Sequence, residues 1–552
     1  MPDRVDFQPD PTAYRHWRLD IEGSVARVTM DVDPDGGLFD NYELKLNSYD
    51  LGVDIELSDI TQRLRFEHPG VKVVVLQSGK DRVFCAGANI KMLGGAAHSH
   101  KVNFCKFTNE TRNTYEAAEA DSGQKWIAAI KGACAGGGYE LALACNHLML
   151  TDDSASSVAL PEVPLLAVLP GTGGLTRVTD KRRVRRDRAD IFCTTEEGIR
   201  GRRAAEWGLV DEVIPNSKFE AAVAERAAEF AAQSAKQDGL TGVALTPLAR
   251  NFGVAGVTYS TVDVAVDRAA RTATLTLHGP TDVPPTDMDA LQREGAQTWM
   301  LRAARELEDA ILHLRLNEME AGLLIFRSQG DPAAVLAHEA VVLGDADHWL
   351  AAEIRHYWKR VLKRIDMTSR SMVAVIEHGS CFAGTLADIL FAVDRSFMME
   401  DEFEGDNRPL ATVTLSAANF GPYPMANGLS RLETRFLGDA KALAAASDLK
   451  GAPLDAEAAD DAGLVTLILD DIDWDDELRI FIEERASFSP DAMTGMEANL
   501  RFAGPETMET RIFGRLTAWQ NWIFNRPNAV GENGALQRYG TGRRGEYDME
   551  RV

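Results

Sequence analysis

The sequence is poor in the features that mark membrane, secreted and metal-stabilised proteins. No apolar run approaches the roughly 20 residues needed to cross a bilayer. The first residues also lack the basic and then apolar pattern of a secretory signal. The 6 cysteines form no CxxC pair and have no histidine at zinc-ligand spacing. We therefore expect a cytoplasmic protein with reduced thiols and no metal site.

Basic residues are outnumbered by acidic ones. The chain has 59 Lys and Arg against 84 Asp and Glu, a formal net charge of −25 at pH 7. A charge of this sign repels nucleic acid and acidic membrane surfaces, so we expect neither as a partner. An anionic substrate would have to bind where basic residues are locally concentrated.

What the sequence does contain predicts an α/β fold. At 552 residues the chain is too long for one ordinary core. Strand-like runs alternate with segments of helical spacing. The strand-like runs are 25–32, 71–76, 126–130 and 147–150, and the helical segments include 104–119 and 139–145.

The same order of patterns returns about 250 residues later, which indicates a tandem duplication. The later runs are 273–277, 323–328 and 372–376, and Gly379-Ser380-Cys381 follows the last of them as Gly132-Ala133-Cys134 follows 126–130. We expect a first domain at 1–235, a linker at 236–258, a second domain at 259–490 and a C-terminal helical region with a polar tail at 491–552.

Three short motifs combine small residues with carboxylates. Residues 83–91 lead from a strand into an Ala- and Gly-rich turn. Residues 132–145 place three glycines between a buried strand and a helix, where free N–H groups could stabilise an oxyanion. The Gly-x-Gly-x-x-Gly pattern of a dinucleotide site is absent, which argues against a nicotinamide cofactor. Residues 160–164 set Glu162 between two prolines.

The two carboxylates in these motifs each have an ordinary alternative. Glu140 alone would be an acid in the first turn of a helix, and Glu162 alone a surface turn residue. Together, behind two turns of small residues, they favour a general acid/base pair.

In this order and spacing the motifs resemble the enoyl-CoA hydratase/isomerase (crotonase) superfamily, strongly over residues 20–230 and weakly in the second half. The resemblance implies tandem crotonase-like (ββα spiral) domains, of which the first is catalytic. It places the two oxyanion-hole amides on Ala88 and Gly137, and the catalytic glutamates on Glu140 and Glu162.

The resemblance also implies an acyl-CoA substrate and no separate cofactor, since CoA is part of the substrate. The residues expected to bind the substrate or its CoA are Lys45, Ala86, Ala88, Ile90 and Gly136. Superfamily members assemble into oligomers, and for a doubled chain we expect a homodimer.

The second half departs from the family pattern. Ala337-His338-Glu339 stands where the first turn was. If a one-residue insertion falls after Cys381, Thr385 and Asp388 take the positions of Gly137 and Glu140. If it falls later, Ala387 takes the glutamate position. We interpret this half as a degenerate structural partner.

Within the superfamily, the doubled layout and residues 41–57 resemble enzymes of aerobic, CoA-dependent benzoate degradation. This implies hydrolytic ring opening of 2,3-epoxy-2,3-dihydrobenzoyl-CoA to 3,4-dehydroadipyl-CoA semialdehyde and formate. An enoyl-CoA hydratase or isomerase of a fatty or other acyl-CoA is the alternative. A non-catalytic CoA-binding or assembly protein is the alternative from another class.

Overall fold

The computed structural model describes residues 4–400 and 408–552. The chain divides into two compact units, Met1–Leu245 (unit 1) and Thr246–Val552 (unit 2). Their boundary falls inside the expected linker 236–258. No helix among the described residues has both the length and the apolar character to cross a membrane.

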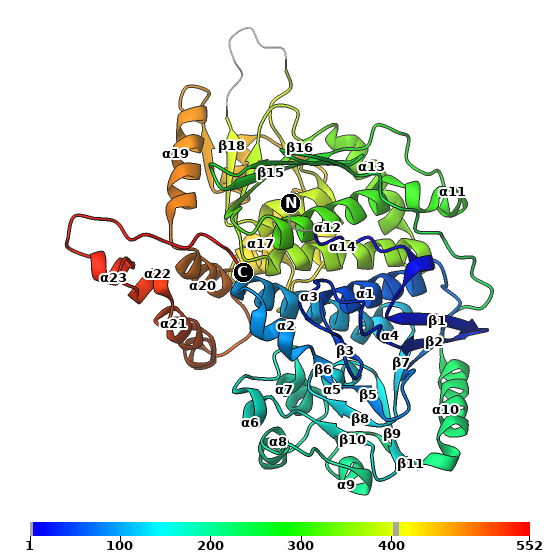
Figure 1. Cartoon of the computed structure of the whole chain (residues 1–552). Coiled ribbons are helices and arrows are strands. Elements are labelled where there is room, and N and C mark those ends of the chain that lie inside the picture. The colour runs from blue at the N-terminus through cyan, green and yellow to red at the C-terminus, as the bar shows by residue number, and fades with distance from the viewer. Residues whose placement is uncertain (1–3, 401–407) are drawn as a thin grey trace. The chain divides into compact units, whose positions relative to one another are not determined.

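The larger sheet of unit 1 has six strands in the order β1-β2-β4-β7-β9-β11 (Figure 1). Only the first pair is antiparallel. The strands are β1 (Trp17–Glu22), β2 (Val25–Met30), β4 (Val73–Ser78), β7 (Lys125–Ile130), β9 (His147–Asp152) and β11 (Glu212–Pro215). Helix α10 (Phe219–Gln233) packs Phe219, Val223 and Ala227 onto the buried residues of β4, β7 and β9. The continuous apolar runs of the central strands are therefore buried in a parallel sheet.

A second, smaller sheet of unit 1 carries the three motifs. Its parallel strands are β5 (Val83–Cys85), β8 (Ala133–Ala135) and β10 (Ser157–Ala159), in the order β10-β8-β5. A short parallel pair joins β3 (Ser48–Tyr49) to β6 (Gly87–Ala88). The carboxyl ends of parallel strands lie at one edge, so the segments that follow β5, β8 and β10 lie next to one another.

Helices connect and cover these strands. Asp50 caps α1 by accepting a hydrogen bond from the Val53 amide, and Asn89 caps α2 through the Met92 amide. The helices are α1 (Leu51–Phe66), α2 (Ile90–Gly95), α3 (His98–Glu116), α4 (Ala118–Ser122), α5 (Gly137–Leu143), α6 (Glu162–Leu166), α7 (Gly174–Thr176), α8 (Arg186–Cys193) and α9 (Gly201–Glu206).

Unit 2 is built on an eight-stranded sheet in simple chain order, antiparallel from β12 to β15 and parallel from β15 onward. The strands are β12 (Asn251–Gly253), β13 (Gly256–Thr258), β14 (Val262–Asp267), β15 (Thr272–His278), β16 (Leu323–Gln329), β17 (Ser371–Ile376), β18 (Arg395–Met399) and β21 (Leu467–Leu469). Strands β12 and β13 thus occupy the second half of the expected linker. A separate antiparallel pair joins β19 (Val413–Thr414) to β20 (Pro453–Leu454).

The two units repeat one topology, as the sequence predicts. The order β14-β15-β16-β17-β18-β21 repeats β1-β2-β4-β7-β9-β11, with one antiparallel pair followed by parallel strands. Helix α19 (Trp474–Ser487) packs Trp474, Leu478 and Phe481 onto β16, β17 and β18, as α10 does in unit 1. The side chain of Asp394 accepts a hydrogen bond from the Met372 amide (2.9 Å), as Asn146 does from the Trp126 amide (2.7 Å).

Two helices of unit 2 lie in segments whose sequence offers little indication of a helix. Ala337-His338-Glu339, which stands in the position of the first turn, forms part of helix α13. The polar tail contains a short helix, α23. The helices are α11 (Met288–Glu294), α12 (Trp299–Asn317), α13 (Pro332–Gly344), α14 (Trp349–Met367), α15 (Ala387–Ala392), α16 (Arg431–Arg435), α17 (Ala440–Asp448), α18 (Ala456–Asp461), α20 (Pro490–Arg501), α21 (Thr517–Ile523), α22 (Pro527–Val530) and α23 (Ala535–Arg538).

Candidate active site

The three motifs meet at the carboxyl edge of the small sheet in unit 1. The turn after β5 carries Ala88, and the turn after β8 leads into α5 with Gly137 and Glu140. The segment after β10 carries Glu162, and the Gly136 amide donates to the Ala159 carbonyl (2.9 Å). The structure therefore brings together the four residues that the sequence assigned to chemistry.

The backbone amides of Ala88 and Gly137 lie in two turns that contact each other. Ala88 pairs with Tyr49 in the β3-β6 ladder, and the Asn89 amide donates to the Tyr49 carbonyl, so the Ala88 N–H faces away from β3. Gly137 is the first residue of α5, where an N–H has no partner within the helix. A Cβ on Gly87 would lie 2.8 Å from the Gly137 nitrogen, so the two turns are in close contact.

Gly87 therefore sets the spacing between the two turns. It has φ +88°, and a Cβ there would also lie 2.9 Å from the Ala135 carbonyl oxygen. We expect Gly87→Ala to push the turns apart and to lower kcat by about 100-fold or more, the typical effect of losing one oxyanion donor. Gly94→Ala is the control, because no atom lies within 4 Å of a Cβ at that exposed position. Equal rates for both variants would contradict this spacing role.

Glu140 is buried (2 % exposed) and held by the loop that precedes α7. Its Oε1 accepts hydrogen bonds from the Thr172 amide (3.0 Å) and the Gly174 amide (2.7 Å), and its Oε2 accepts from the Thr172 hydroxyl. Donors therefore fix both carboxylate oxygens, and the orientation of Glu140 depends on Thr172.

Glu162 is also buried (8 % exposed), but it is held differently. Its Oε2 has no hydrogen-bond partner among the described residues, and its Oε1 lies 3.0 Å from the position of a Cβ on Gly136. Burial, and next the negative charge of Glu140, raise the pKa of Glu162 to about 7. Glu162 can therefore take up or release a proton near neutral pH, and it is not a surface turn residue.

The residues expected to bind the substrate or its CoA lie along the same edge. The Ala86 amide donates to the Leu46 carbonyl (3.1 Å), which brings the loop containing Lys45 beside the first turn. Lys45, Ala86 and Ile90 are exposed. Gly136 is buried with φ +54°. Three of these residues are therefore accessible to solvent at this edge.

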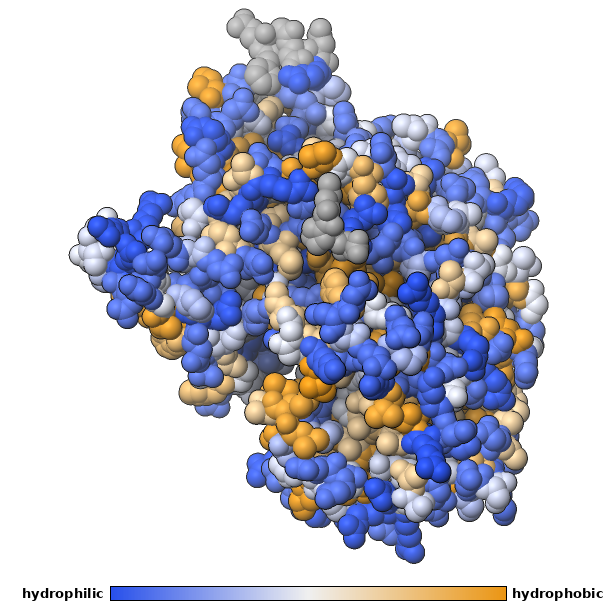
Figure 2. Space-filling model, in the orientation of Figure 1, coloured by the Kyte–Doolittle hydropathy of each residue, from blue (hydrophilic) through white to orange (hydrophobic). Residues whose placement is uncertain are grey.

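Apolar side chains are exposed directly after Glu162. Figure 2 shows hydrophobic surface in the region of α7. The exposed apolar residues of α6 and of the segment that follows it are Val163 (41 % exposed), Leu165 (56 %), Leu166 (36 %), Val168 (51 %) and Leu169 (65 %). Exposed apolar side chains that lie together mark a surface that contacts a ligand or another protein segment.

Sequence reasoning missed three residues that build the site, namely Tyr49, Arg112 and Thr172. The Arg112 guanidinium donates to the carbonyls of Gly137 and Thr172 (3.0 Å each) and to the Tyr49 hydroxyl. Tyr49 lies within residues 41–57, but the sequence assigned none of the three a role in the site. Only the folded chain brings them together, because they lie in distant parts of the sequence.

In unit 2 the turn that corresponds to Gly136-Gly137 binds a carboxylate of the same unit. Gly384 has φ +51°, like Gly136 with φ +54°, which aligns Thr385 with Gly137 and Asp388 with Glu140. The insertion therefore falls after Cys381, not later. The Glu339 carboxylate accepts hydrogen bonds from both the amide and the hydroxyl of Thr385. The amide that corresponds to an oxyanion donor is thus bound to an internal carboxylate.

Asp388 is a buried acid in this modified turn (1 % exposed). Burial is the main cause that raises its pKa to about 7, although Arg431 opposes the shift. A folded-state pKa above the unfolded value of about 3.9 means that stability is lost as pH rises from about 4 through 7. At pH 8 we expect urea denaturation to give Asp388→Asn a free energy of unfolding about 1–3 kcal/mol higher than that of wild type. The gain should vanish below pH 4.

The exposed Asp448→Asn on α17 is the control for the loss of one negative charge and should show no such pH dependence. If Asp388→Asn were destabilised equally at pH 4 and pH 8, Asp388 would be a structural hydrogen-bonding group and not a desolvated acid.

Comparison with known proteins shows the family of the chain. Residues 41–241 match the family model described as enoyl-CoA hydratase/isomerase. The chain is 54% identical over 548 residues to benzoyl-CoA-dihydrodiol lyase from Aromatoleum evansii, covering 99% of this chain and 98% of that one. It is 32% identical over 236 residues to the fatty acid oxidation complex subunit alpha of Shewanella loihica, covering 42% of this chain and 31% of that one.

Among solved structures, an enoyl-CoA hydratase from Bacillus anthracis is 29% identical with a TM-score of 0.34, covering 39% of this chain and 76% of that one. The full-length relative decides the family. The chain belongs to the enoyl-CoA hydratase/isomerase (crotonase) superfamily and, within it, to the benzoyl-CoA-dihydrodiol lyase family.

Proposed function

We propose that the protein hydrolytically opens the ring of 2,3-epoxy-2,3-dihydrobenzoyl-CoA and releases formate, in aerobic CoA-dependent benzoate degradation. The observation that carries this proposal is the pair of buried glutamates beside two oxyanion amides. The 54% identity to an enzyme named for a benzoyl-CoA dihydrodiol supports an aromatic acyl group. The exposed apolar side chains that follow Glu162 also suit such a group.

In this proposal the thioester carbonyl accepts hydrogen bonds from the Ala88 and Gly137 amides. The ring is conjugated to that carbonyl, so negative charge that develops during ring opening is stabilised at its oxygen. Glu162 takes a proton from the attacking water, because its carboxyl exchanges protons near neutral pH. Glu140, held by Thr172 and Gly174, orients water or the epoxide oxygen on the same face.

The reaction balances with water alone. The epoxide of benzoyl-CoA plus two waters has the atoms of 3,4-dehydroadipyl-CoA semialdehyde plus formate. We propose that no metal, flavin or oxygen takes part, because the strained epoxide already carries the reactivity and the overall change is hydrolytic.

We further propose a homodimer. Helical segments near the C-terminus expose apolar side chains that a second copy could cover. These include Leu500 (67 % exposed), Met508 (73 %), Phe513 (72 %) and Phe524 (55 %). Sedimentation of the full chain should give twice the monomer mass, and a monomer at micromolar concentration would contradict the proposal. A cytoplasmic location stays a prediction.

A substrate panel tests the proposed reaction. The purified protein is given enzymatically prepared 2,3-epoxybenzoyl-CoA and, separately, crotonyl-CoA, and formate and thioester consumption are followed. We expect formate from the epoxide and no hydration of crotonyl-CoA. Hydration of crotonyl-CoA without formate would keep the fold and the site but assign the enzyme to fatty enoyl-CoA. Inactivity with both would favour a CoA-binding protein.

A further inference from the structure

One guanidinium in unit 1 joins three segments that build the proposed site. Arg112 lies on α3 and is fully buried (0 % exposed). Its Nη2 donates to the Gly137 carbonyl (3.0 Å) and the Tyr49 hydroxyl, and its Nη1 donates to the Thr172 carbonyl (3.0 Å). Its three acceptors are two carbonyls and a hydroxyl, whereas a buried arginine usually pairs with a carboxylate.

Each of the three contacts leads to a different catalytic element. Gly137 supplies one oxyanion amide. Tyr49 pairs in the ladder with Ala88, which supplies the other amide. The amide and hydroxyl of Thr172 hold the carboxylate of Glu140. Residues 49, 137 and 172 are far apart in the sequence, so interactions between sequence neighbours do not fix their relative positions.

The space around this arrangement leaves little freedom. The Tyr49 hydroxyl fills the position that a Cβ on Gly137 would occupy. The Tyr49 side chain is itself buried (2 % exposed), and the Arg112 guanidinium carbon lies 5.7 Å from the centre of its ring. A glycine at 137 therefore permits the tyrosine, and the tyrosine and arginine together fix the peptide of Gly137.

We propose that Arg112 is a positioning residue that links the two oxyanion amides to the loop holding Glu140. It touches no substrate. Its effect is to set the distance between the amides and the orientation of Glu140, so that all three act on one bound thioester. This inference rests on the proposed function for its catalytic consequence, but the geometry it describes can be measured without turnover.

The charge of Arg112 also reaches Glu162. It is one of the influences that lower the pKa of Glu162, against burial and the charge of Glu140, which raise it. The thiol of Cys193 on α8 also interacts with the charge of Glu162. Removing the guanidinium should therefore move the pH at which Glu162 titrates upward.

Isotope-edited infrared spectroscopy of bound benzoyl-CoA, labelled with carbon-13 at the thioester carbonyl, tests the proposal directly. Two aligned amide donors polarise the carbonyl and lower its stretching frequency, so wild type should show a downward shift on binding. Arg112→Met should lose most of that shift, with kcat lower by about 100-fold and KM changed only a few-fold. Arg112→Lys should be intermediate, because an ammonium lacks the planar fork that spans three acceptors.

Arg65→Met is the matched control. Arg65 is another buried arginine of unit 1 (1 % exposed), and it pairs with Asp121 (3.4 Å). Its loss should lower the unfolding temperature but leave the carbonyl frequency and the pH profile unchanged. If Arg112→Met does not fold, Tyr49→Phe removes one of the three contacts and should reduce the carbonyl shift in a folded protein.

The outcomes separate this inference from the proposed function. A folded Arg112→Met protein with the wild-type carbonyl shift and pH profile would overturn the positioning role. If wild type shifts the carbonyl of crotonyl-CoA but does not bind benzoyl-CoA, the proposed substrate is wrong, and the role of Arg112 is then decided with crotonyl-CoA. No shift with either thioester would overturn the oxyanion assignment and the inference with it.

Discussion

Glu162→Gln is expected to fold as wild type does and to release formate at least about 1000-fold more slowly. Glutamine keeps the shape of the side chain but cannot accept a proton from water. The Oε2 of Glu162 has no hydrogen-bond partner among the described residues, so the substitution leaves no donor unpaired there. The loss should therefore fall on kcat, and formate release under saturating substrate measures it.

The pH dependence of the rate tests the role of Glu162 in a second way. With the pKa of Glu162 at about 7, the wild-type rate should rise through neutral pH as the carboxyl loses its proton. This limb should be absent from the residual activity of Glu162→Gln. A rate that instead falls above pH 7 would make Glu162 the proton donor.

Glu206→Gln is the control for this experiment, since Glu206 is exposed and forms an ion pair with Arg202 at the surface of α9. It should retain full activity. Full activity in Glu162→Gln as well would remove Glu162 from the mechanism.

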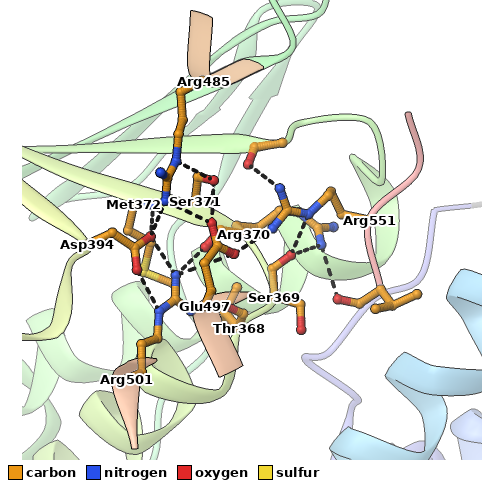
Figure 3. A network of polar contacts seen from close by, with 12 residues as sticks. Thr368, Ser369, Arg370, Ser371, Met372, Asp394, Arg485, Glu497, Arg501 and Arg551 are labelled. Carbon is orange, nitrogen blue, oxygen red and sulfur yellow. Dashed lines mark hydrogen bonds and ion pairs between the residues drawn. The ribbon is translucent and has the colours of Figure 1, made fainter. Parts of the chain in front are cut away.

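The largest effect on stability is expected in unit 2, at Glu497 of α20. This carboxylate is 1 % exposed and lies at the centre of a network that Figure 3 shows. Its oxygens accept hydrogen bonds from Arg551 (2.7 Å), Arg485 (3.3 Å) and the hydroxyl of Ser371. We expect Glu497→Ala to lower the free energy of unfolding by about 3–5 kcal/mol, because it leaves buried arginines without their counter-charge.

The neighbouring charges explain why this loss should be so large. Arg370, fully buried beside this network, already has its pKa lowered by burial and by the charges of Arg551 and Arg315. Removing Glu497 leaves these positive charges unbalanced. Chemical denaturation measures the effect, and hydrogen exchange should show faster exchange around Arg551.

Glu506→Gln serves as the control, because Glu506 and Arg515 form an ion pair near the surface. Its loss should cost about 1 kcal/mol or less. If Glu497→Ala were no less stable than Glu506→Gln, the network would contribute nothing to the stability of unit 2.

The sequence predicted those parts of the site that lie in short motifs at strand ends. Ala88, Gly137, Glu140 and Glu162 each follow a small-sheet strand within a few residues, so the motifs and the family resemblance pointed to residues that the structure brings together. Arg112 could not be found in this way. It is one arginine in a helix, and its three contacts come from residues 25 to 63 positions away.

The repeated topology was also predictable from local pattern, because buried parallel strands have continuous apolar sequences. The blocked turn of unit 2 could not be predicted from the sequence. Glu339 reaches Thr385 from α13, 46 residues earlier in the chain, and its neighbours in sequence suggested only a missing turn. The docking of Arg551 onto Glu497 was also missed, because a Gly- and Arg-rich composition is typical of polar tails.

Ring cleavage itself is tested most directly by carbon-13 nuclear magnetic resonance with 2,3-epoxybenzoyl-CoA labelled at all six ring carbons. The account predicts that one labelled carbon leaves as formate while the other five remain in a CoA thioester with a new aldehyde signal. A product that keeps all six labelled carbons in one molecule, as simple hydration of the epoxide to a diol would give, would contradict it.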